Sequence, residues 1–425
     1  MVHQHFMLVD TLSALDNVML GAEPDWQLQR ARALVRQRLD GLMHDTGLAV
    51  NLDALVQDLP VGQRQRLEIL KALYRGARIL ILDEPTAVLT PQETEHLFGT
   101  LRRLRERGTT VLLITHKLKE IMALCDAVTV MRGGQVVLDC AIADTSLDGL
   151  AEAMVGRRVN LGREADAAVA TPGAVLLQAQ GLSVTDALGV QRLTDVALTL
   201  RAGEIVGIAG VSGNGQSELL DVLSGLLTPT QGTLQVGSRT FTPKAWIDTR
   251  AARALHIAHV PEDRHKRALV LPFDAWESAV LGYQGQARYS RGGWMRQRQM
   301  KGDCAQMMER YDVRPRNPVL RSSKFSGGNQ QKLVLAREAM LQPQVLLVGQ
   351  PTRGVDIGAI EFIHGRLRAM RDAGGAVLVV SSELDEILAL SDRVIVMNAG
   401  RIAGELPIAD CSEAALGRLM GGVGA

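Results

Sequence analysis

Two adjacent carboxylates are the first residues in the sequence that could do chemistry. Asp83 and Glu84 close the segment RILILDEP, whose apolar residues are typical of a buried strand. A carboxylate at such a strand end can hold Mg²⁺, and a second one can polarise an attacking water. His116 follows the next apolar run, TTVLLITHK, so we expect it beside Glu84 at the carboxyl edge of a parallel sheet. Alternatively, Asp-Glu-Pro only ends a strand and His116 is structural.

A glycine-rich turn could bind phosphate. The segment GVSGNGQS lies between the apolar run EIVGIA and a helical pattern, and it fits the spacing of the phosphate-binding loop G-x-x-x-x-G-K-[ST]. Backbone N–H groups and the N-terminus of the following helix can cradle phosphate oxygens. Gln216 stands where the loop has a lysine, whereas Ser217 keeps the hydroxyl. Taken alone, an ordinary strand-to-helix turn explains the segment equally well.

A third pattern could also receive an anion. A serine, two glycines and two amides open a predicted helix, whose Lys332 and Arg337 are expected to form a basic face. The positive end of the helix dipole favours negative charge at such a position. The alternative is a helix N-cap followed by flexible glycines. The pattern consists of Ser326, Gly327, Gly328, Asn329 and Gln330.

The motifs belong to an internal repeat. Leu59 aligns with Phe325, an offset of 325 − 59 = 266 residues, and the same offset pairs Asp83 with Gly349 and His116 with Ser382. A constant offset predicts two copies of one domain, and alternating strands and helices predict a parallel sheet covered by helices. The expected domains are residues 1–156 and 174–425, joined by a linker at 157–173. The segment VLLQAQGLSV from Val175 is expected to be an edge strand, with further antiparallel strands within 174–255.

Composition excludes several classes of protein. Lys and Arg number 47 against 46 Asp and Glu, so the net charge of +1 shows no excess of positive charge that would indicate nucleic-acid binding. No apolar run approaches the roughly 20 residues that span a bilayer. The cysteines form no CxxC pair, which fits a reducing cytosol and predicts neither disulfides nor a zinc site. They are Cys125, Cys140, Cys304 and Cys411.

Together the motifs resemble those of the ABC ATPase family over essentially the whole chain. SGGNQ is similar to the signature motif, LDEP to Walker B, His116 to the switch histidine and Gln4 to the Q-loop glutamine. The resemblance implies an α/β fold of two tandem ABC-type P-loop NTPase domains that use ATP and Mg²⁺. SGGNQQK in the second copy resembles the tandem ATPases of sugar and nucleoside importers, and VHQHFMLV, EPTAVLTPQE and VGQPTRGVD look most like the nucleoside-type subgroup.

The resemblance implies two unequal nucleotide sites, because each site in this family combines one domain's loops with the other's signature. In the first, Glu84 and His116 are catalytic, and Asp83 and Gln4 hold Mg²⁺ with a Walker A Ser/Thr. Nucleotide there is bound by Gln4, Asp83, Ser326, Gly327, Gly328, Asn329 and Gln330. The second has Gln216, Gly349, Gln350, Ser382 and Glu262 where the family has functional groups. It comprises Gly210, Gly213, Asn214, Gly215, Gln216 and Ser217 with Pro60, Val61, Gly62 and Gln63.

The first copy is expected to lack its N-terminal part, including Walker A, so that this chain alone has little or no ATPase activity. The resemblance implies transmembrane permease subunits as partners, and through them a solute-binding protein, at the cytoplasmic face of the membrane. Phe6, Met7 and Leu8, followed by a helix starting at Leu15, are expected to contact the permease; alternatively, they pack inside their own domain. The competing hypotheses are a soluble, non-transport ABC protein and an inactive remnant.

Overall fold

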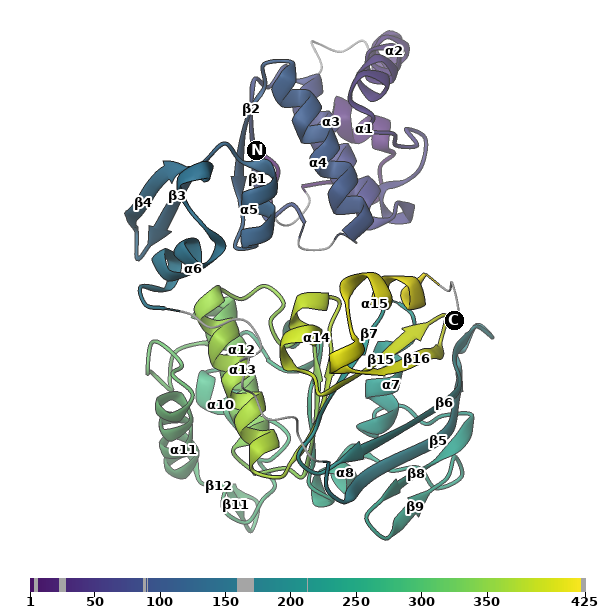
Figure 1. Cartoon of the computed structure of the whole chain (residues 1–425), viewed down its shortest axis with the longest axis vertical. Helices are drawn as coiled ribbons and strands as arrows, with labels where there is room; N and C mark the ends of the chain where they lie inside the picture. Colours follow the sequence, from purple (N-terminus) through teal and green to yellow (C-terminus); the bar gives the residue numbers. More distant parts are fainter. Residues whose placement is uncertain are drawn as a thin grey trace. The chain divides into compact units, whose positions relative to one another are not determined.

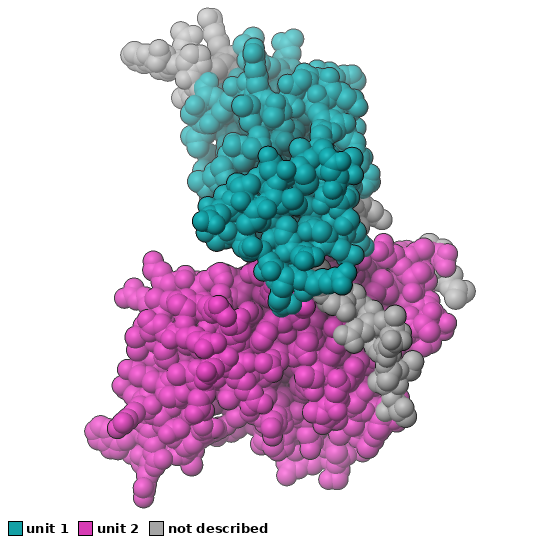
Figure 2. Space-filling view, turned by 60° about the vertical axis from the view of Figure 1, so that its left-hand side comes forward, with its two compact units in different colours: residues 1–159 teal, residues 160–425 magenta. Residues whose placement is uncertain are grey.

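The computed structural model describes residues 1–3, 7–22, 28–86, 89, 91–158, 172–211 and 213–421. The chain divides into two compact units, Met1–Val159 and Asn160–Ala425 (Figure 2). This division falls within the expected linker, most of which lies outside the described residues. Within the described ranges, no helix combines the length and the apolar character needed to cross a membrane.

Unit 1 is built around a short parallel sheet. Strands β1 and β2 pair in parallel, and Val2 forms a further parallel bridge to Leu82 of β1. Strands β3 and β4 form a separate antiparallel pair. The described elements are α1 (Ala14–Met19), α2 (Leu28–Thr46), α3 (Val61–Tyr74), β1 (Ile79–Asp83), α4 (Pro91–Glu106), β2 (Thr110–Ile114), α5 (Leu118–Leu124), β3 (Ala127–Arg132), β4 (Gln135–Ala141) and α6 (Leu147–Val155).

Unit 2 contains two larger sheets. Five strands of its six-stranded sheet run parallel, in the order β10-β13-β14-β7-β15, and β16 is added antiparallel at the edge. A four-stranded antiparallel sheet, β6-β5-β8-β9, lies on the opposite side of the unit from α10 and α11 (Figure 1).

The elements of unit 2 follow the expected alternation of strands and helices from β13 to β15. The described elements are β5 (Val175–Thr185), β6 (Gln191–Arg201), β7 (Ile205–Ala209), α7 (Gln216–Leu223), β8 (Gln231–Val236), β9 (Arg239–Phe241), α8 (Thr249–Ala254), β10 (Ile257–Val260), α9 (Arg264–Arg267), α10 (Ala275–Ala279), β11 (Ser290–Arg291), β12 (Trp294–Met295), α11 (Gln297–Arg310), α12 (Gly327–Ala339), β13 (Val345–Gly349), α13 (Ile357–Asp372), β14 (Ala376–Val380), α14 (Leu384–Leu390), β15 (Arg393–Asn398), β16 (Arg401–Pro407) and α15 (Glu413–Met420).

The offset found in the sequence recurs in the elements. Strand β13 begins 345 − 79 = 266 residues after β1, and β14 begins 376 − 110 = 266 residues after β2. The same offset relates α13 to α4, α14 to α5, β15 to β3 and β16 to β4. Upstream, Val2 bridges Leu82, and Val260 pairs with Val348. Because the same offset relates Leu82 to Val348, Val2 corresponds to Val260. The strand pairing therefore identifies which residue of unit 2 corresponds to each residue at the carboxyl edge of the unit 1 sheet.

The two parallel sheets differ in how they are covered. Every residue of β13 and β14 is buried, because helices pack on one face and the antiparallel sheet with α7 packs on the other. In unit 1 the first of these faces is buried in β1 and partly buried in β2, but the second carries Ile79, Leu112 and Ile114 at 60%, 49% and 50% exposure. Burying one such side chain stabilises a protein by about 1.5–3 kcal/mol. The bare face is therefore the main packing difference between the two sheets.

Two expectations from the sequence were wrong. Strand β5 is not an edge strand, because it pairs with β6 on one side and β8 on the other. The helix after Ser326 has no basic face formed by Arg337, since this residue is 5% exposed and pairs with Glu338. The expected antiparallel strands within 174–255 are present as β5, β6, β8 and β9.

Candidate functional site

In unit 1, the carboxyl edge of the sheet brings Glu84 and His116 together. Asp83 is the last residue of β1, and the parallel register with β2 places the residues after Ile114 beside it. The Nδ1 atom of His116 lies 2.9 Å from Oε1 of Glu84. This juxtaposition confirms the contact expected from the two strand ends. Gln4, also assigned to this site, lies outside the described residues.

The backbone at Glu84 is unusual. Its φ is 45°, in the left-handed region that costs a non-glycine residue about 1 kcal/mol or more. Its N–H donates to the carbonyl of Ile114 at 2.8 Å, which holds the turn against the neighbouring strand. The chain therefore leaves the strand abruptly at Glu84, and the carboxylate is directed toward His116.

The same backbone arrangement occurs in unit 2 with different side chains. Gln350 has a φ of 47°, and its N–H donates to the carbonyl of Val380 at 2.7 Å. Oε1 of Gln350 accepts from the hydroxyl of Ser382 at 3.2 Å, where the first unit has the Glu84–His116 pair. The second unit retains the geometry, but an amide and a hydroxyl replace the acid and the imidazole.

Contact with His116 also shifts the acidity of Glu84. The hydrogen bond from His116 lowers the pKa of Glu84, the charges of His116 and Lys117 act in the same direction, and partial burial opposes them. A carboxyl with a lowered pKa stays ionised at neutral pH, and it can therefore accept a hydrogen bond or a proton from water.

Replacing His116 should raise the pKa of Glu84. Because the folded-state pKa lies below the unfolded value, the stabilisation from this pair is present above the unfolded pKa. It is lost as pH falls through the folded pKa. We expect His116→Ala to move the Glu84 titration to higher pH, measured by carboxyl ¹³C NMR with Glu84→Gln to assign the signal. His96→Ala, at an exposed surface histidine, is the control; an unchanged titration in His116→Ala would contradict the coupling.

The glycine-rich turn of unit 2 links β7 to α7, as expected. Gly213 and Gly215 adopt φ values of 91° and 97°, and Gly215 is the N-cap of α7. Gln216 is 6% exposed and folds back into the turn, where its Nε2 donates to the carbonyl of Val211 at 3.1 Å. Ser217 donates its hydroxyl to Oε2 of Glu262 at 2.7 Å. Gln216 supplies no positive charge for a phosphate.

The segment from Ser326 caps helix α12. The Ser326 hydroxyl accepts from Nδ2 of Asn329 at 2.8 Å, and the backbone N–H of Asn329 points to the same oxygen. At Gly327 a Cβ would lie 2.6 Å from the carbonyl of Gly354, so the close approach of two backbones requires glycine. Packing therefore requires glycine at residue 327, in addition to any need for backbone flexibility. The corresponding helix of unit 1, α3, begins after Pro60, which makes no side-chain cap.

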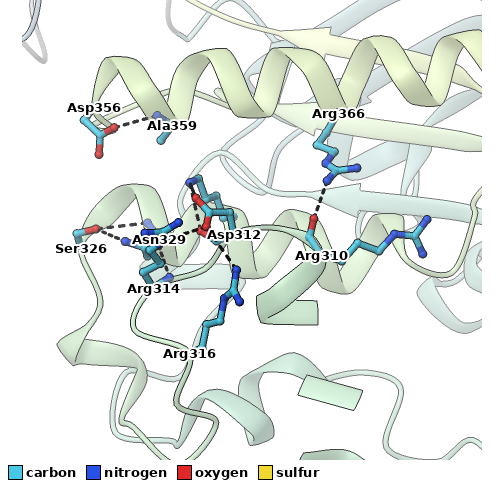
Figure 3. Close-up of polar contacts among 10 residues, drawn as sticks. Arg310, Asp312, Arg314, Arg316, Ser326, Asn329, Asp356, Ala359 and Arg366 are labelled. Atoms are coloured by element: carbon cyan, nitrogen blue, oxygen red, sulfur yellow. Dashed lines mark hydrogen bonds and ion pairs between the residues drawn. The ribbon is translucent and has the colours of Figure 1, made fainter. Parts of the chain in front are cut away.

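A polar network that the sequence did not reveal holds Asn329 (Figure 3). The backbone N–H of Arg314 donates to Oδ1 of Asn329 at 2.7 Å, and the Arg314 guanidinium donates to Asp312 at 2.8 Å. Lys332 of α12 lies 3.5 Å from the other oxygen of Asp312. Both amide atoms of Asn329 are thereby engaged, so its side chain has a fixed orientation next to Ser326. No spacing rule connects residues 312–314 with 329, which explains why sequence reasoning missed them.

Gln330 is fixed by a different set of contacts. It is 5% exposed, its Nε2 donates to the carbonyl of Ser322 at 3.0 Å, and Nε2 of His265 lies 2.7 Å from its Oε1. Gln330 therefore packs inside the unit and does not present its amide to a ligand. Of the five residues assigned from this pattern, Ser326 and Asn329 have the more accessible polar groups.

Comparisons with known proteins agree with these motifs. A sequence model of the ABC transporter family matches residues 1–87 and 193–353. The nucleoside import ATP-binding protein NupA of Lactococcus lactis is 42% identical over 422 residues, which cover 99% of this chain and 82% of that protein. The guanosine import ATP-binding protein NupO of Bacillus subtilis is 44% identical over 427 residues, with the same shares.

A sugar importer component is similar to the chain as well. The ribose import ATP-binding protein RbsA of Corynebacterium glutamicum is 38% identical over 407 residues, covering 96% of this chain and 75% of that protein. The family match extends over more than half of the chain, and these relatives match it almost throughout. The chain therefore belongs to the ATP-binding proteins of the ABC transporter family.

Proposed function

We propose that the chain is the ATP-binding and ATP-hydrolysing subunit of an importer for nucleosides or simple sugars, where hydrolysis energises uptake. The observation that carries the proposal is the pairing of Glu84 with His116 in a chain that is similar along 99% of its length to nucleoside import ATP-binding proteins. A carboxylate held ionised at the edge of a parallel sheet is suited to orienting and deprotonating water.

The functional residues of unit 1 would each have a separate role in hydrolysis. Glu84 would accept the proton of the attacking water, and His116 would keep the Glu84 carboxylate oriented. Asp83 and Gln4 would hold Mg²⁺, since oxygen donors suit that ion, and bound Mg²⁺ would neutralise phosphate charge. In unit 2, Ser326, Gly327, Gly328 and Asn329 would meet the terminal phosphate of a nucleotide held by another ABC domain, with Gln330 supporting them from inside the unit.

Unit 2 would bind nucleotide without hydrolysing it. Gly213 and Gly215 have positive φ values and Gly215 is the N-cap of α7, which suits a turn that binds phosphate, but Gln216 adds no charge. Gln350 cannot act as a base, and Ser382 replaces the histidine that would orient one. The segment of unit 1 assigned to the degenerate site, Pro60, Val61, Gly62 and Gln63, begins a helix without a capping hydroxyl.

We further propose that the units are tandem ABC domains, with the first at 1–156, a linker at 157–173 and the second at 174–425. The common offset of their elements supports this arrangement. The bare face of the β1-β2 sheet supports a first domain whose phosphate cradle and covering strands lie outside this sequence, since the equivalent face in unit 2 is covered by β5, β6 and α7. The chain by itself would then turn over little ATP.

The proposed partners are transmembrane permease subunits and, through them, a solute-binding protein, with the chain bound peripherally at the cytoplasmic face. Met7 is 65% exposed and is available for such a contact, whereas Leu8 packs partly against the core of unit 1. Phe6 lies outside the described residues.

Solute uptake tests the proposal. The subunit, completed at its first domain and expressed with its permease, should support uptake of labelled nucleoside or ribose. Uptake should fall at least about tenfold when the subunit is omitted. Assays with guanosine and ribose in parallel would identify the solute class. A subunit that stays monomeric, does not co-purify with a polytopic membrane protein and leaves uptake unchanged would contradict the proposal.

A further inference from the structure

A short hairpin in unit 2 has an exposed apolar tip. Strands β11 and β12 pair antiparallel, and the two residues between them, Gly292 and Gly293, have φ values of 58° and 85°. Positive φ at both central residues is typical of the tight turns that join two strands through two residues. Trp294 follows this turn directly and is 83% exposed, and Met295 after it is 51% exposed. The hairpin therefore presents two large apolar side chains to solvent.

The base of the hairpin is fixed to the core of unit 2, next to α11 (Figure 1). Tyr289, directly before β11, is 3% exposed, and its carbonyl accepts from the backbone N–H of Arg296 at 2.8 Å. Met300, in the first turn of α11, is fully buried. Anchoring on both sides keeps the tip at the surface, so Trp294 and Met295 are not core residues of this unit.

The residues around the tip are basic. Residues 284–302 include five cations and no Asp or Glu, although the whole chain has a net charge of only +1. Arg288 pairs with the buried Asp303, but three other arginines are exposed and form no ion pair with any residue that the structure describes. Positive charge is thus concentrated beside the tip and is available to an anion. These three arginines are Arg291, Arg296 and Arg298.

The pairing of the two strands places a cation and an aromatic ring on one face. Arg291 pairs with Trp294 across the hairpin, so their side chains share a face of the ribbon. Met295 lies on the other face, because neighbouring residues of a strand alternate. Tryptophan is enriched where a membrane meets water, with its ring at the level of the headgroups, and arginine forms strong hydrogen bonds with phosphate. The tip therefore combines the groups that suit the surface of a bilayer.

We propose that the β11-β12 hairpin docks on an anionic lipid surface, with Trp294 in the headgroup region and the three exposed arginines against lipid phosphates. The exposed tip is a single run of residues, 291–299, which is smaller than the roughly 20–30 residues that one side of a specific protein interface uses. A lipid surface needs no matching shape, so a small basic and aromatic tip is sufficient. This contact is separate from both nucleotide sites and would add to the permease contacts proposed above.

Flotation of the 425-residue chain with lipid vesicles tests the proposal. Vesicles of phosphatidylcholine alone are compared with vesicles that also contain about one quarter phosphatidylglycerol. The chain should bind the anionic vesicles at least about tenfold more tightly. Raising NaCl from about 0.1 M to about 1 M should remove the difference, because the Debye length falls from about 10 Å to about 3 Å. The vesicles contain no permease, so no protein partner contributes to this binding.

A matched pair of charge variants locates the binding on the hairpin. The double variant Arg291→Gln with Arg298→Gln should bind anionic vesicles at least about tenfold more weakly, because both arginines are expected to contact lipid phosphates. The control, Arg401→Gln with Arg418→Gln, removes two exposed arginines from β16 and α15 and should leave binding unchanged. The bare sheet face of unit 1 is the same in every variant, so it affects all of them equally.

A second pair of variants tests the apolar part of the contact. Trp294→Ala should weaken binding to anionic vesicles at least about threefold, because the indole ring no longer enters the headgroup region. Leu188→Ala removes an apolar side chain that is 87% exposed in the loop between β5 and β6, and it should have no effect. Thermal unfolding of each variant establishes that the fold is retained.

The outcomes decide between lipid and other partners. Weaker binding in both hairpin variants, with unchanged binding in both controls, supports the proposal. Equal binding to the two kinds of vesicle, or full affinity in either hairpin variant, overturns it. A chain that binds vesicles only when they contain the permease also overturns it, because the contact is then with protein. None of these results depends on ATP hydrolysis, so the proposed function is tested separately.

Discussion

Glu84→Gln should lower ATP turnover of the assembled importer at least about a hundredfold, within the range by which general bases accelerate reactions. The substitution keeps the shape of the side chain and one acceptor oxygen for His116, but it removes the group that takes a proton from water. Nucleotide binding should persist. Steady-state phosphate release, measured in an importer whose first domain carries the N-terminal part proposed above, gives the result.

The matched control for this variant lies at the corresponding position of unit 2. Gln350→Glu restores an acid on the same left-handed turn, since Gln350 and Glu84 have φ values of 47° and 45°. We expect no gain in turnover, because Gln216 and Ser382 still lack the charge and the imidazole that an active site needs. Substantial turnover in Glu84→Gln, or activity gained by Gln350→Glu, would mean that hydrolysis has been assigned to the wrong unit.

The largest effect on stability is expected at Arg337. Its Nε donates to Oε1 of Glu338 at 2.7 Å, the two side chains are 6% and 3% exposed, and further bonds reach the carbonyls of Ala268 and Ser278. Tyr283 donates its hydroxyl to the other oxygen of Glu338. Arg337→Leu would leave a buried carboxylate without its cation, which costs about 3–5 kcal/mol.

Urea unfolding, monitored by tryptophan fluorescence, measures this loss in the free energy of unfolding. Trp246, Trp276 and Trp294 lie in unit 2 and only Trp26 in unit 1, so the signal reports mainly on the second unit. Arg316→Leu is the control, because Arg316 is 52% exposed and lies 3.8 Å from the exposed Glu309. Such surface pairs contribute about 1 kcal/mol or less. Similar losses in the two variants would contradict the structural role given to Arg337.

Much of the site could be predicted because parallel strands align their carboxyl ends. The runs before Glu84 and His116 are short and apolar, so each motif could be placed at a strand end, and the pair followed from the register. The constant offset likewise predicted which residues of the second copy correspond to them. Local patterns and a repeat were sufficient for these features.

Other features depend on contacts between segments that no local pattern links. The run from Val175 gives no sign of the second neighbour that makes β5 an internal strand. The sequence pattern predicts Arg337 as a surface cation. Its burial becomes evident only from its contacts with Glu338 and with surrounding backbone carbonyls in the structure. The side chain of Glu262 fills the space beside Gly349, and no spacing in the sequence reveals this contact.

The most direct test of the central claim counts how much of the bound ATP is hydrolysed in one turnover. The importer, with the N-terminal part of the first domain proposed above, would be loaded with radiolabelled ATP, started with Mg²⁺ and quenched after a single cycle. If unit 1 hydrolyses and unit 2 only binds, about half of the bound nucleotide should be recovered as ADP and the rest as ATP. Recovery of all bound nucleotide as ADP would contradict the account.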